Sequence, residues 1–520
     1  MKLNQLIEHH DQGTAFAPGF VWTEVSGVGD VAVYPRSLNR IGGLLLFIGK
    51  EGVRKSLYLL NHGSEADATK PFQGQTILEF RSSDDSYLIR CPMNNHNARA
   101  IRDHFEFTRP RLIGLSDSFG FGCRIGQSNP GHIRSLEGSR FKPVLAQQSI
   151  RELQRTGRTP EEVLDATTWA VLQEGYRDGF GADADHLKTE QDIDLMVRAG
   201  FTMFTIDPSA YVVNDAATKS KEQIELAAAK LPWKDLRDTL ASCLARYVEK
   251  PIVFGRELTI SATRREILNG LVKYGGVIAH ASKLYHYLKA KYPSHPAEFE
   301  LSVDETDSPT TPFEHYLVVN ELKRLGVSLV SVAPRFIGEF EKGIDYKGDI
   351  ESFKKEYLKH VLIANALGPY KISIHSGSDK FQVYAAIGSL KRGHVHVKTA
   401  GTSYLEALRV TAAKEPALFR EILDFCRGIY EEEKKTYHVS AELSRVKEAA
   451  SYSDAEVLNL FEDNDARQVL HVTFGKVLTT TAAGGGFRFK DRILHCLNEY
   501  EETWCAFLEK HFRRHLDPFA

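Results

Sequence analysis

The sequence lacks long hydrophobic runs. None of its apolar runs reaches the roughly 18 residues that a membrane-spanning helix needs. The opening segment MKLNQLIEHHDQG also lacks the apolar core of a secretory signal. These two absences predict a protein that does not enter membranes and that works in the cytoplasm.

Neither sign of charge dominates the chain. Its 520 residues include 66 basic and 68 acidic ones, which give a formal net charge of −2, and no basic block stands out. A nucleic-acid-binding surface normally needs such a block, so we expect no nucleic-acid partner. A chain of this length can bury a large core without covalent cross-links.

Cysteine is scarce and scattered. No two cysteines form a CxxC pair, the spacing typical of zinc and redox sites. The pattern indicates reduced thiols in a cytoplasmic protein and argues against a cysteine-based metal site. The six cysteines are Cys91, Cys123, Cys243, Cys426, Cys496 and Cys505.

A dinucleotide-binding fingerprint is also missing. Residues 1–110 are rich in short β-like runs that Gly, Asn and Asp punctuate. They contain GVGD at Gly27 to Asp30, but no GxGxxG that a helix follows. We expect a β-rich N-terminal subdomain that does not bind a nucleotide.

From residue 111 onward, short β-like runs alternate with helix-like segments. The segment that starts at Pro160 has an acidic first turn, and the segments at 189–200 and 311–326 run from a Thr cap to a Gly stop. Eight such units predict an α/β fold, a (β/α)8 barrel over residues 111–402. The predicted strand segments are 111–120, 142–149, 179–189, 201–209, 299–307, 327–336, 370–380 and 394–402.

Two regions do not fit the barrel repeat. A largely helical insertion is expected at about residues 215–298, between the fourth and fifth strands. A helical C-terminal region is expected at 403–520. The long C-terminal region could also carry the contact surface of a homodimer.

Polar residues lie between apolar ones in most of the predicted barrel strands. Side chains alternate across a strand, so Ser373 and His375 of KISIHS and Lys398 of VHVK should point into the barrel. Barrel interiors normally hold branched apolar residues, and active sites lie at the C-terminal face. The pattern therefore predicts an active site. The further residues turned inward are Asp183, Asp185, Thr205, Asp207, Ser302, Asp304, Ser331, Ala333, Arg335 and His396, with His186 and Lys188 at the tip of their strand.

Two histidines and one carboxylate are candidate metal ligands. His186, Asp304 and His375 come from three separate strands, and this donor set suits Zn²⁺, with Mn²⁺, Co²⁺ or Ni²⁺ as alternatives. No HxH or HExxH motif concentrates the signal. Each histidine could instead be a hydrogen-bonded core or rim residue.

Asp185, Lys188 and Asp207 form the candidate catalytic set. Neighbouring charges can push the pKa values of two carboxyl groups apart and so give one acid and one base. The alternative for Asp207, which precedes Pro208, is that it caps the following segment.

Basic residues should make the mouth of the site positive. Arg335, Lys380 and Lys398, together with Lys188, suit an anionic or polyhydroxylated substrate, and Arg can hold a carboxylate with two hydrogen bonds. Salt bridges to the neighbouring aspartates are the alternative. Lys398 could also form a Schiff base, as the lysine of some barrel aldolases does.

Two loops add candidate substrate-binding residues. In HSGSDKF, Ser376 and the backbone N–H groups that follow it can form an anion nest, or they can simply cap a helix. The segment SDSFGFG at 116–122 is expected to follow the first strand, where Asp117 could bind hydroxyl groups. The alternative is a plain tight turn.

Three longer motifs occur together: GFGADADHLKT, IHSGSDKF and HVHVKTAGTSYLEALR. They resemble the tagaturonate/fructuronate epimerase family, the UxaE type, and the likeness extends over most of the chain. The resemblance implies a metal-dependent epimerase that inverts C4 of a sugar acid, with related enzymes acting on tagatose and fructose. Carried over by motif, it implies an active site with Asp185, His186, Lys188, His375, Asp379 and Lys380, of which we assign Asp379 and Lys380 to the substrate.

The implied reaction leaves two routes open, because C4 is not adjacent to the ketone. A retro-aldol route breaks C3–C4 and reforms it, whereas a redox route needs bound NAD, which the missing fingerprint disfavours. A second hypothesis is a barrel aldolase or isomerase that acts on sugar acids and depends on a metal or a Schiff base. A sugar-binding protein without activity is a third, but it would not need several inward charges.

Overall fold

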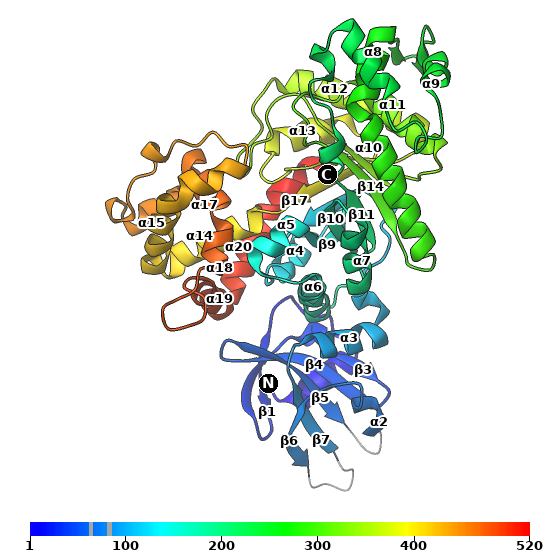
Figure 1. Ribbon diagram of the computed structural model, residues 1–520. Coiled ribbons are helices and arrows are strands. Elements are labelled where there is room, and N and C mark those ends of the chain that lie inside the picture. Colours follow the sequence, from blue (N-terminus) through cyan, green and yellow to red (C-terminus); the bar gives the residue numbers. More distant parts are fainter. Residues whose placement is uncertain (62–65, 81–85) are drawn as a thin grey trace.

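The computed structural model describes residues 1–61, 66–80 and 86–520, and a closed barrel of eight parallel strands lies at its centre (Figure 1). The predicted (β/α)8 fold is therefore confirmed. In order around the barrel, the strands are β8 (Ser118–Phe121), β9 (Lys142–Ser149), β10 (Gly181–Leu187), β11 (Met203–Ile206), β14 (Glu298–Val303), β15 (Ser331–Pro334), β16 (Lys371–Ile374) and β17 (Val395–Thr399).

Helices follow each of these strands and pack around the barrel. Thr159, Thr189 and Thr311 each accept a hydrogen bond from the backbone N–H three residues further on, so these helices begin where the sequence signals placed them. The helices are α4 (Asn129–Ser135), α5 (Ile150–Thr156), α6 (Pro160–Glu174), α7 (Glu190–Ala199), α10 (Arg264–Lys291), α11 (Pro312–Arg324), α12 (Ile350–Leu367), α13 (Phe381–Leu390) and α14 (Thr402–Lys414).

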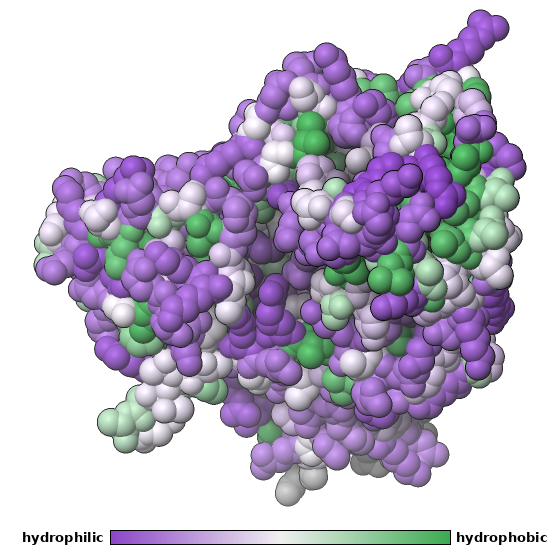
Figure 2. All heavy atoms as spheres, turned by 45° about the horizontal axis from the view of Figure 1, so that its top comes forward, coloured by the Kyte–Doolittle hydropathy of each residue, from purple (hydrophilic) through white to green (hydrophobic). Residues whose placement is uncertain are grey.

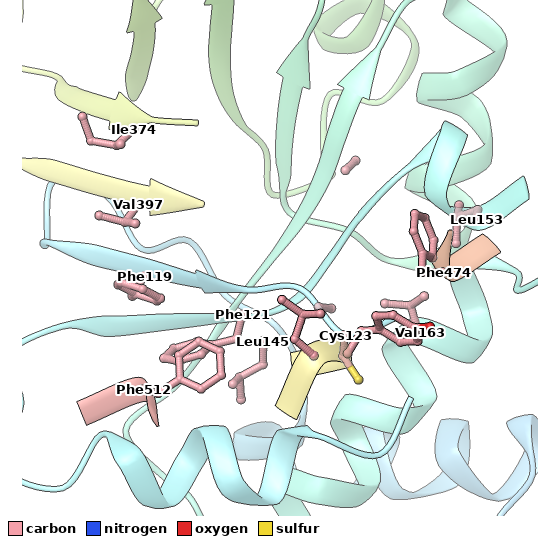
Figure 3. Close-up of a cluster of buried hydrophobic side chains, with 14 of the residues drawn as sticks. Phe119, Phe121, Cys123, Leu145, Leu153, Val163, Ile374, Val397, Phe474 and Phe512 are labelled. Carbon is pink, nitrogen blue, oxygen red and sulfur yellow. The ribbon is translucent and has the colours of Figure 1, made fainter. Parts of the chain in front are cut away.

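The first barrel strand lies further along the chain than expected. Phe119 and Phe121 of β8 point outward into the core, where Figure 3 shows them beside Phe512. Gly120 between them faces inward, and a Cβ there would lie 1.7 Å from Oε1 of Gln147. The glycine of SFGF therefore makes room inside the barrel and does not mark a turn after a strand.

The N-terminal part of the chain forms a sheet of seven mainly antiparallel strands below the barrel (Figure 1). Trp169 and Leu172 of α6 share a hydrophobic cluster with Leu44 and Leu46 of this sheet, which joins it to the barrel. The GVGD segment spans the end of the turn between the first two strands and the start of β2. The elements are α1 (Leu3–Asp11), β1 (Val21–Val25), β2 (Gly29–Val33), β3 (Asn39–Ile41), β4 (Leu44–Glu51), β5 (Arg54–Asn61), α2 (Ala66–Thr69), β6 (Gln75–Phe80), β7 (Ser86–Cys91) and α3 (Asn95–His104).

The expected insertion lies between β11 and β14 and ends in the long helix α10. It has a small hydrophobic core that includes Ile224, Cys243 and Ile267. Besides α10 it contains α8 (Lys221–Ala229), α9 (Leu240–Tyr247), β12 (Ile252–Phe254) and β13 (Leu258–Ile260). The subdomain boundaries near residues 110, 215, 298 and 402 stay predictions.

The C-terminal region is helical and forms a lobe beside the barrel (Figure 1). Its helix α20 returns to the barrel, where Phe512 lies 5.0 Å from Phe121 and 6.2 Å from Phe119 between ring centroids. None of the helices in the described ranges is long and apolar enough to cross a membrane. The elements after α14 are α15 (Pro416–Glu433), α16 (Asp454–Asn459), α17 (Asn464–Val472), α18 (Phe474–Thr479), α19 (Lys490–Glu499) and α20 (Glu501–Leu516).

Candidate active site

A polar cavity of about 620 Å³ lies at the C-terminal ends of the barrel strands. Residues of six strand ends line it, and Tyr437, His438 and His471 of the C-terminal region close one side. Figure 2 shows the surface hollowed between the C-terminal lobe and the barrel, with hydrophilic residues around the hollow. The cavity therefore lies where barrel enzymes hold their active sites.

The strand alternation is confirmed at the strands that form the cavity floor. Ile374 and Val397 belong to the hydrophobic core outside the barrel. Their neighbours His375 and Lys398 point inward and line the cavity. Polar groups thus replace the apolar layers that normally fill this end of a barrel.

A bulge in β10 brings two successive residues into the site. The segment from Ala184 to Leu187 spans only the two-residue step from Phe204 to Ile206 on β11, and His186 adopts a left-handed φ of 53°. Simple alternation would place Asp185 and His186 on opposite faces. The bulge instead lets both side chains line the cavity.

His186, Asp304 and His375 form a cluster that could hold a metal ion. One ligating atom from each of the three lies within 4.8 Å of the others, and the two imidazole rings are 5.2 Å apart between centroids. Asp304 Oδ1 is 3.3 Å from His375 Nδ1. The geometry brings together the three residues that the sequence proposed as ligands.

Each histidine of this cluster has a carboxylate behind it. His375 Nε2 is 2.7 Å from Glu300 Oε1, and His186 Nδ1 is 3.4 Å from Asp207 Oδ2. Carboxylates in this position orient the imidazole of metal-binding histidines. Sequence reasoning missed Glu300, although it has the same strand parity as Ser302 and Asp304.

The carboxylates also set the electrostatics of the cluster. Burial alone would lower the histidine pKa values, but Asp185 raises the pKa of His186 to about 9, and Asp304 raises that of His375 to about 10. Burial would raise the pKa of Asp304, yet His375 holds it well below its usual range. The cluster therefore has a field that favours positive charge at its centre.

Two other groups have metal-ligand spacing, but a guanidinium already occupies each. Arg467 binds the carboxylate of the group Asp379, His511 and His515. Arg246 likewise contacts Asp238 and Glu321 of the remaining group. Among the described residues, the cavity cluster is thus the one whose donor set fits a cation.

Lys398 lies beneath the cluster and is surrounded by carboxylates. Its Nζ is 2.7 Å from Asp183 Oδ2, 2.9 Å from Asp185 Oδ1 and 2.8 Å from Glu300 Oε1. Burial would lower the pKa of Lys398, but these carboxylates raise it well above its ordinary value. Sequence reasoning placed Lys398 in the site. In the structure its positive charge neutralises the surrounding carboxylates.

Lys188 and Asp207, two of the three predicted catalytic residues, do not line the cavity. Lys188 is half-exposed, and its Nζ lies 3.2 Å from Asp207 Oδ2, on the far side of His186. Burial would raise the pKa of Asp207, but His186 keeps it below its usual range. This position suits a pair that orients His186, and Asp185 faces the cavity; the roles of Lys188 and Asp207 in proton transfer stay predictions.

Three predicted substrate-binding residues lie outside the cavity, which corrects their expected role. Asp117 precedes β8 at the opposite end of the barrel, where it accepts a hydrogen bond from the Val395 backbone. Asp379 binds Arg467 and His511 at 2.6 Å each. The Lys380 ammonium is buried and donates to the backbone carbonyl groups of Glu341, Ile344 and Ser378.

Two other substrate-binding candidates do line the cavity. Arg335 donates to the carbonyl of Gly338 and pairs with Glu339, and Ser376 adopts a φ of 51° and accepts from Lys342. Sequence reasoning missed further lining residues that come from loops, from the start of α5 and from the C-terminal region, where no strand pattern marks them. These are Arg124, Arg151, Lys342 and His471.

A closed (β/α)8 barrel with a charged cavity at its C-terminal face defines a barrel enzyme, here with a candidate cation site. A family model described as tagaturonate epimerase matches residues 34–519. The tagaturonate/fructuronate epimerase of Thermotoga maritima is 40% identical over 490 residues, which cover 93% of this chain and 96% of that protein. The chain therefore belongs to the tagaturonate epimerase family, as its motifs predicted, and is a carbohydrate epimerase.

Solved structures agree with this assignment. The glycerol complex of the fructuronate-tagaturonate epimerase UxaE from Cohnella laeviribosi has a TM-score of 0.87 and 36% identity, and covers 99% of both chains. The native structure of the same enzyme has a TM-score of 0.86 and 37% identity over the same share. The barrel and its flanking regions are thus common to both proteins.

Proposed function

We propose that this enzyme interconverts fructuronate and tagaturonate by inverting C4, with a divalent metal ion held by His186, Asp304 and His375. The observation that carries the proposal is the convergence of these ligands within 4.8 Å at the floor of a polar cavity. The name of the 40% identical relative supports the substrate pair. Tagatose and fructose are the alternative pair.

The donor set of two imidazoles and one carboxylate favours Zn²⁺, with Mn²⁺, Co²⁺ or Ni²⁺ as alternatives. Such an ion would act as a Lewis acid that polarises the substrate ketone. Glu300 and Asp207 would fix the orientation of the two imidazoles. A bound nicotinamide is not needed for this chemistry.

Retro-aldol chemistry fits the residues that face the cavity. Asp185 takes the proton of the C4 hydroxyl, C4 becomes an aldehyde carbon, and the electrons of the C3–C4 bond pass into an enediolate over C2 and C3. Rotation about C4–C5 then presents the other aldehyde face, C3–C4 reforms, and Asp185 returns the proton. Burial would raise the pKa of Asp185, but His186 and Lys398 lower it to about 2, so Asp185 is an ionised carboxylate at neutral pH.

The test uses metal-stripped enzyme with fructuronate and, separately, with fructose. Zn²⁺, Mn²⁺, Co²⁺ or Ni²⁺ is then added back, and the sugars are analysed by chromatography. We expect the C4 epimer to appear only after metal is restored, and no nicotinamide to be released on denaturation. Epimerisation by the stripped enzyme would refute metal dependence, and three-carbon cleavage products alone would favour an aldolase.

A further inference from the structure

The cavity contains two basic side chains that have no carboxylate oxygen within 4.0 Å among the described residues. Five lysines and arginines line it, and Arg124, Arg335 and Lys398 each have a carboxylate oxygen within 4.0 Å. Arg151 and Lys342 have no such partner within the described ranges. An unpaired ammonium and an unpaired guanidinium that face the same cavity indicate an anionic ligand.

Lys342 lies in the loop between β15 and α12, beside the candidate metal cluster. Its Nζ donates to Ser376 Oγ at 2.6 Å, and Ser376 directly follows the candidate ligand His375. Burial lowers the pKa of Lys342, and the nearby charge of Arg151 lowers it further. An anion bound here would raise the pKa of Lys342 again, because its negative charge would neutralise the like charges of Lys342 and Arg151.

Arg151 lies in the first turn of α5, across the cavity wall from the C-terminal region. Its side chain is exposed, and its guanidinium carbon lies 5.8 Å from the centre of the Tyr437 ring. Glu152, the next residue, pairs with Arg124 at 2.9 Å. The guanidinium of Arg151 therefore remains available to a ligand.

Arg124 adds a buried donor at the same end of the cavity. Arg124 donates its Nε–H to Glu152 Oε1 at 3.0 Å, and its Nη2 pairs with the same oxygen. The guanidinium carbon of Arg124 lies 3.7 Å from the centre of the Phe474 ring. Its Nη1 is buried without a hydrogen-bond partner, although Arg124 lines the cavity. Buried donors are rarely left unpaired, so a ligand oxygen is the partner that this group lacks.

We propose that Arg151 and Lys342 bind the C6 carboxylate of a hexuronate, with Arg124 as an additional donor. This inference rests on the proposed function and names the groups that select the sugar acid. A ketohexose has a neutral hydroxymethyl group at C6, which leaves the two charges unpaired. Since Ser376 links Lys342 to His375, one sugar can reach both the carboxylate site and the metal cluster.

The test compares wild-type enzyme with Lys342→Met and Arg151→Gln, each loaded with the same metal. Loss of one charged hydrogen bond to a carboxylate should raise KM for fructuronate about tenfold or more. Lys342→Arg should restore much of the affinity. Lys355→Met, on the exposed face of α12, is the matched control and should behave as wild type. Metal content and thermal midpoint are measured for every variant.

Two further readouts separate charge recognition from general binding. KM for fructuronate should rise with ionic strength in the wild type and rise less in Lys342→Met. In both variants the kcat/KM for fructose should stay within about threefold of wild type, because the C6 hydroxymethyl group of fructose is uncharged and forms no ion pair with Lys342 or Arg151. Equal losses for both sugars, or an unchanged KM for fructuronate in both variants, would overturn the inference. If wild-type enzyme converts neither sugar, the proposed function itself fails.

Discussion

Glu300 should affect metal binding indirectly, because it orients the imidazole of His375. Glu300→Gln keeps the side-chain size but removes the charge that fixes His375 Nε2, at 2.7 Å. Loss of such a partner typically weakens metal binding about 10- to 100-fold. Competition titration with a chromophoric chelator measures the affinity directly, without relying on activity.

Glu298→Gln is the matched control for this change. Glu298 lies two residues earlier on β14, where it accepts a hydrogen bond from the Gly114 backbone. Its variant should bind metal as the wild type does. Equal affinity in Glu300→Gln and wild type would refute the orienting role.

Lys398 should not form a Schiff base with the substrate. Burial favours the neutral amine, but Asp183, Asp185 and Glu300 raise its pKa well above the ordinary value, so the group stays protonated at neutral pH. A protonated amine is not a nucleophile. Borohydride added during turnover should therefore leave the activity and the protein mass unchanged. A mass increase on the peptide that contains Lys398 would instead support the aldolase reading.

At the scale of elements, a buried ion network ties α17 and α20 to the loop after β16. Asp379 binds Arg467 and His511, each at 2.6 Å. Asp379→Asn leaves Arg467 buried without its counter-charge, and breaking such a pair costs about 3–5 kcal/mol of unfolding free energy. Urea denaturation at neutral pH measures this loss.

The pH dependence of the same variant gives a second check. Burial would raise the pKa of Asp379, but Arg467 and His511 lower it well below its usual range. A lowered pKa stabilises the fold above the unfolded-state value and loses that contribution as the pH falls. The stability difference between wild type and Asp379→Asn should thus shrink on acidification below about pH 4. A constant difference would contradict the assignment.

Elements also show how far sequence reasoning reached. Alternation placed Ser373 and Lys398 correctly because they lie within regular strands, and it still held for His375, which directly follows β16. The motif resemblance placed Asp379 in the site, but positive φ angles at Ser376 and Asp379 redirect the chain, and Asp379 binds Arg467 instead. Parity holds only while the backbone stays extended.

For the whole molecule, the C-terminal region is part of the barrel's core. Phe512 packs against Phe119 and Phe121 and is fully buried. Phe512→Ala should reduce the unfolding free energy by about 3–5 kcal/mol. Phe507→Ala, on the same helix but half-buried, should cost clearly less. Chemical denaturation of the full chain compares the two, and equal losses would contradict a special role for Phe512.

The missed cavity residues reflect this whole-molecule arrangement. Eight βα units could be counted from the sequence because each has local signals. Arg124, Arg151 and Lys342 follow strands without any periodicity, and His471 reaches the cavity from α17, which comes after the last barrel strand. Only the folded chain brings them together.

The packing of α20 on β8 also bears on how the protein is made. Helix α20 leaves the ribosome after every barrel strand, so a nascent chain has Phe119 and Phe121 uncovered while the barrel strands already exist. Such exposed aromatic surface is what chaperones bind. A partly synthesised chain should therefore depend on chaperones until α20 has emerged and covered this face.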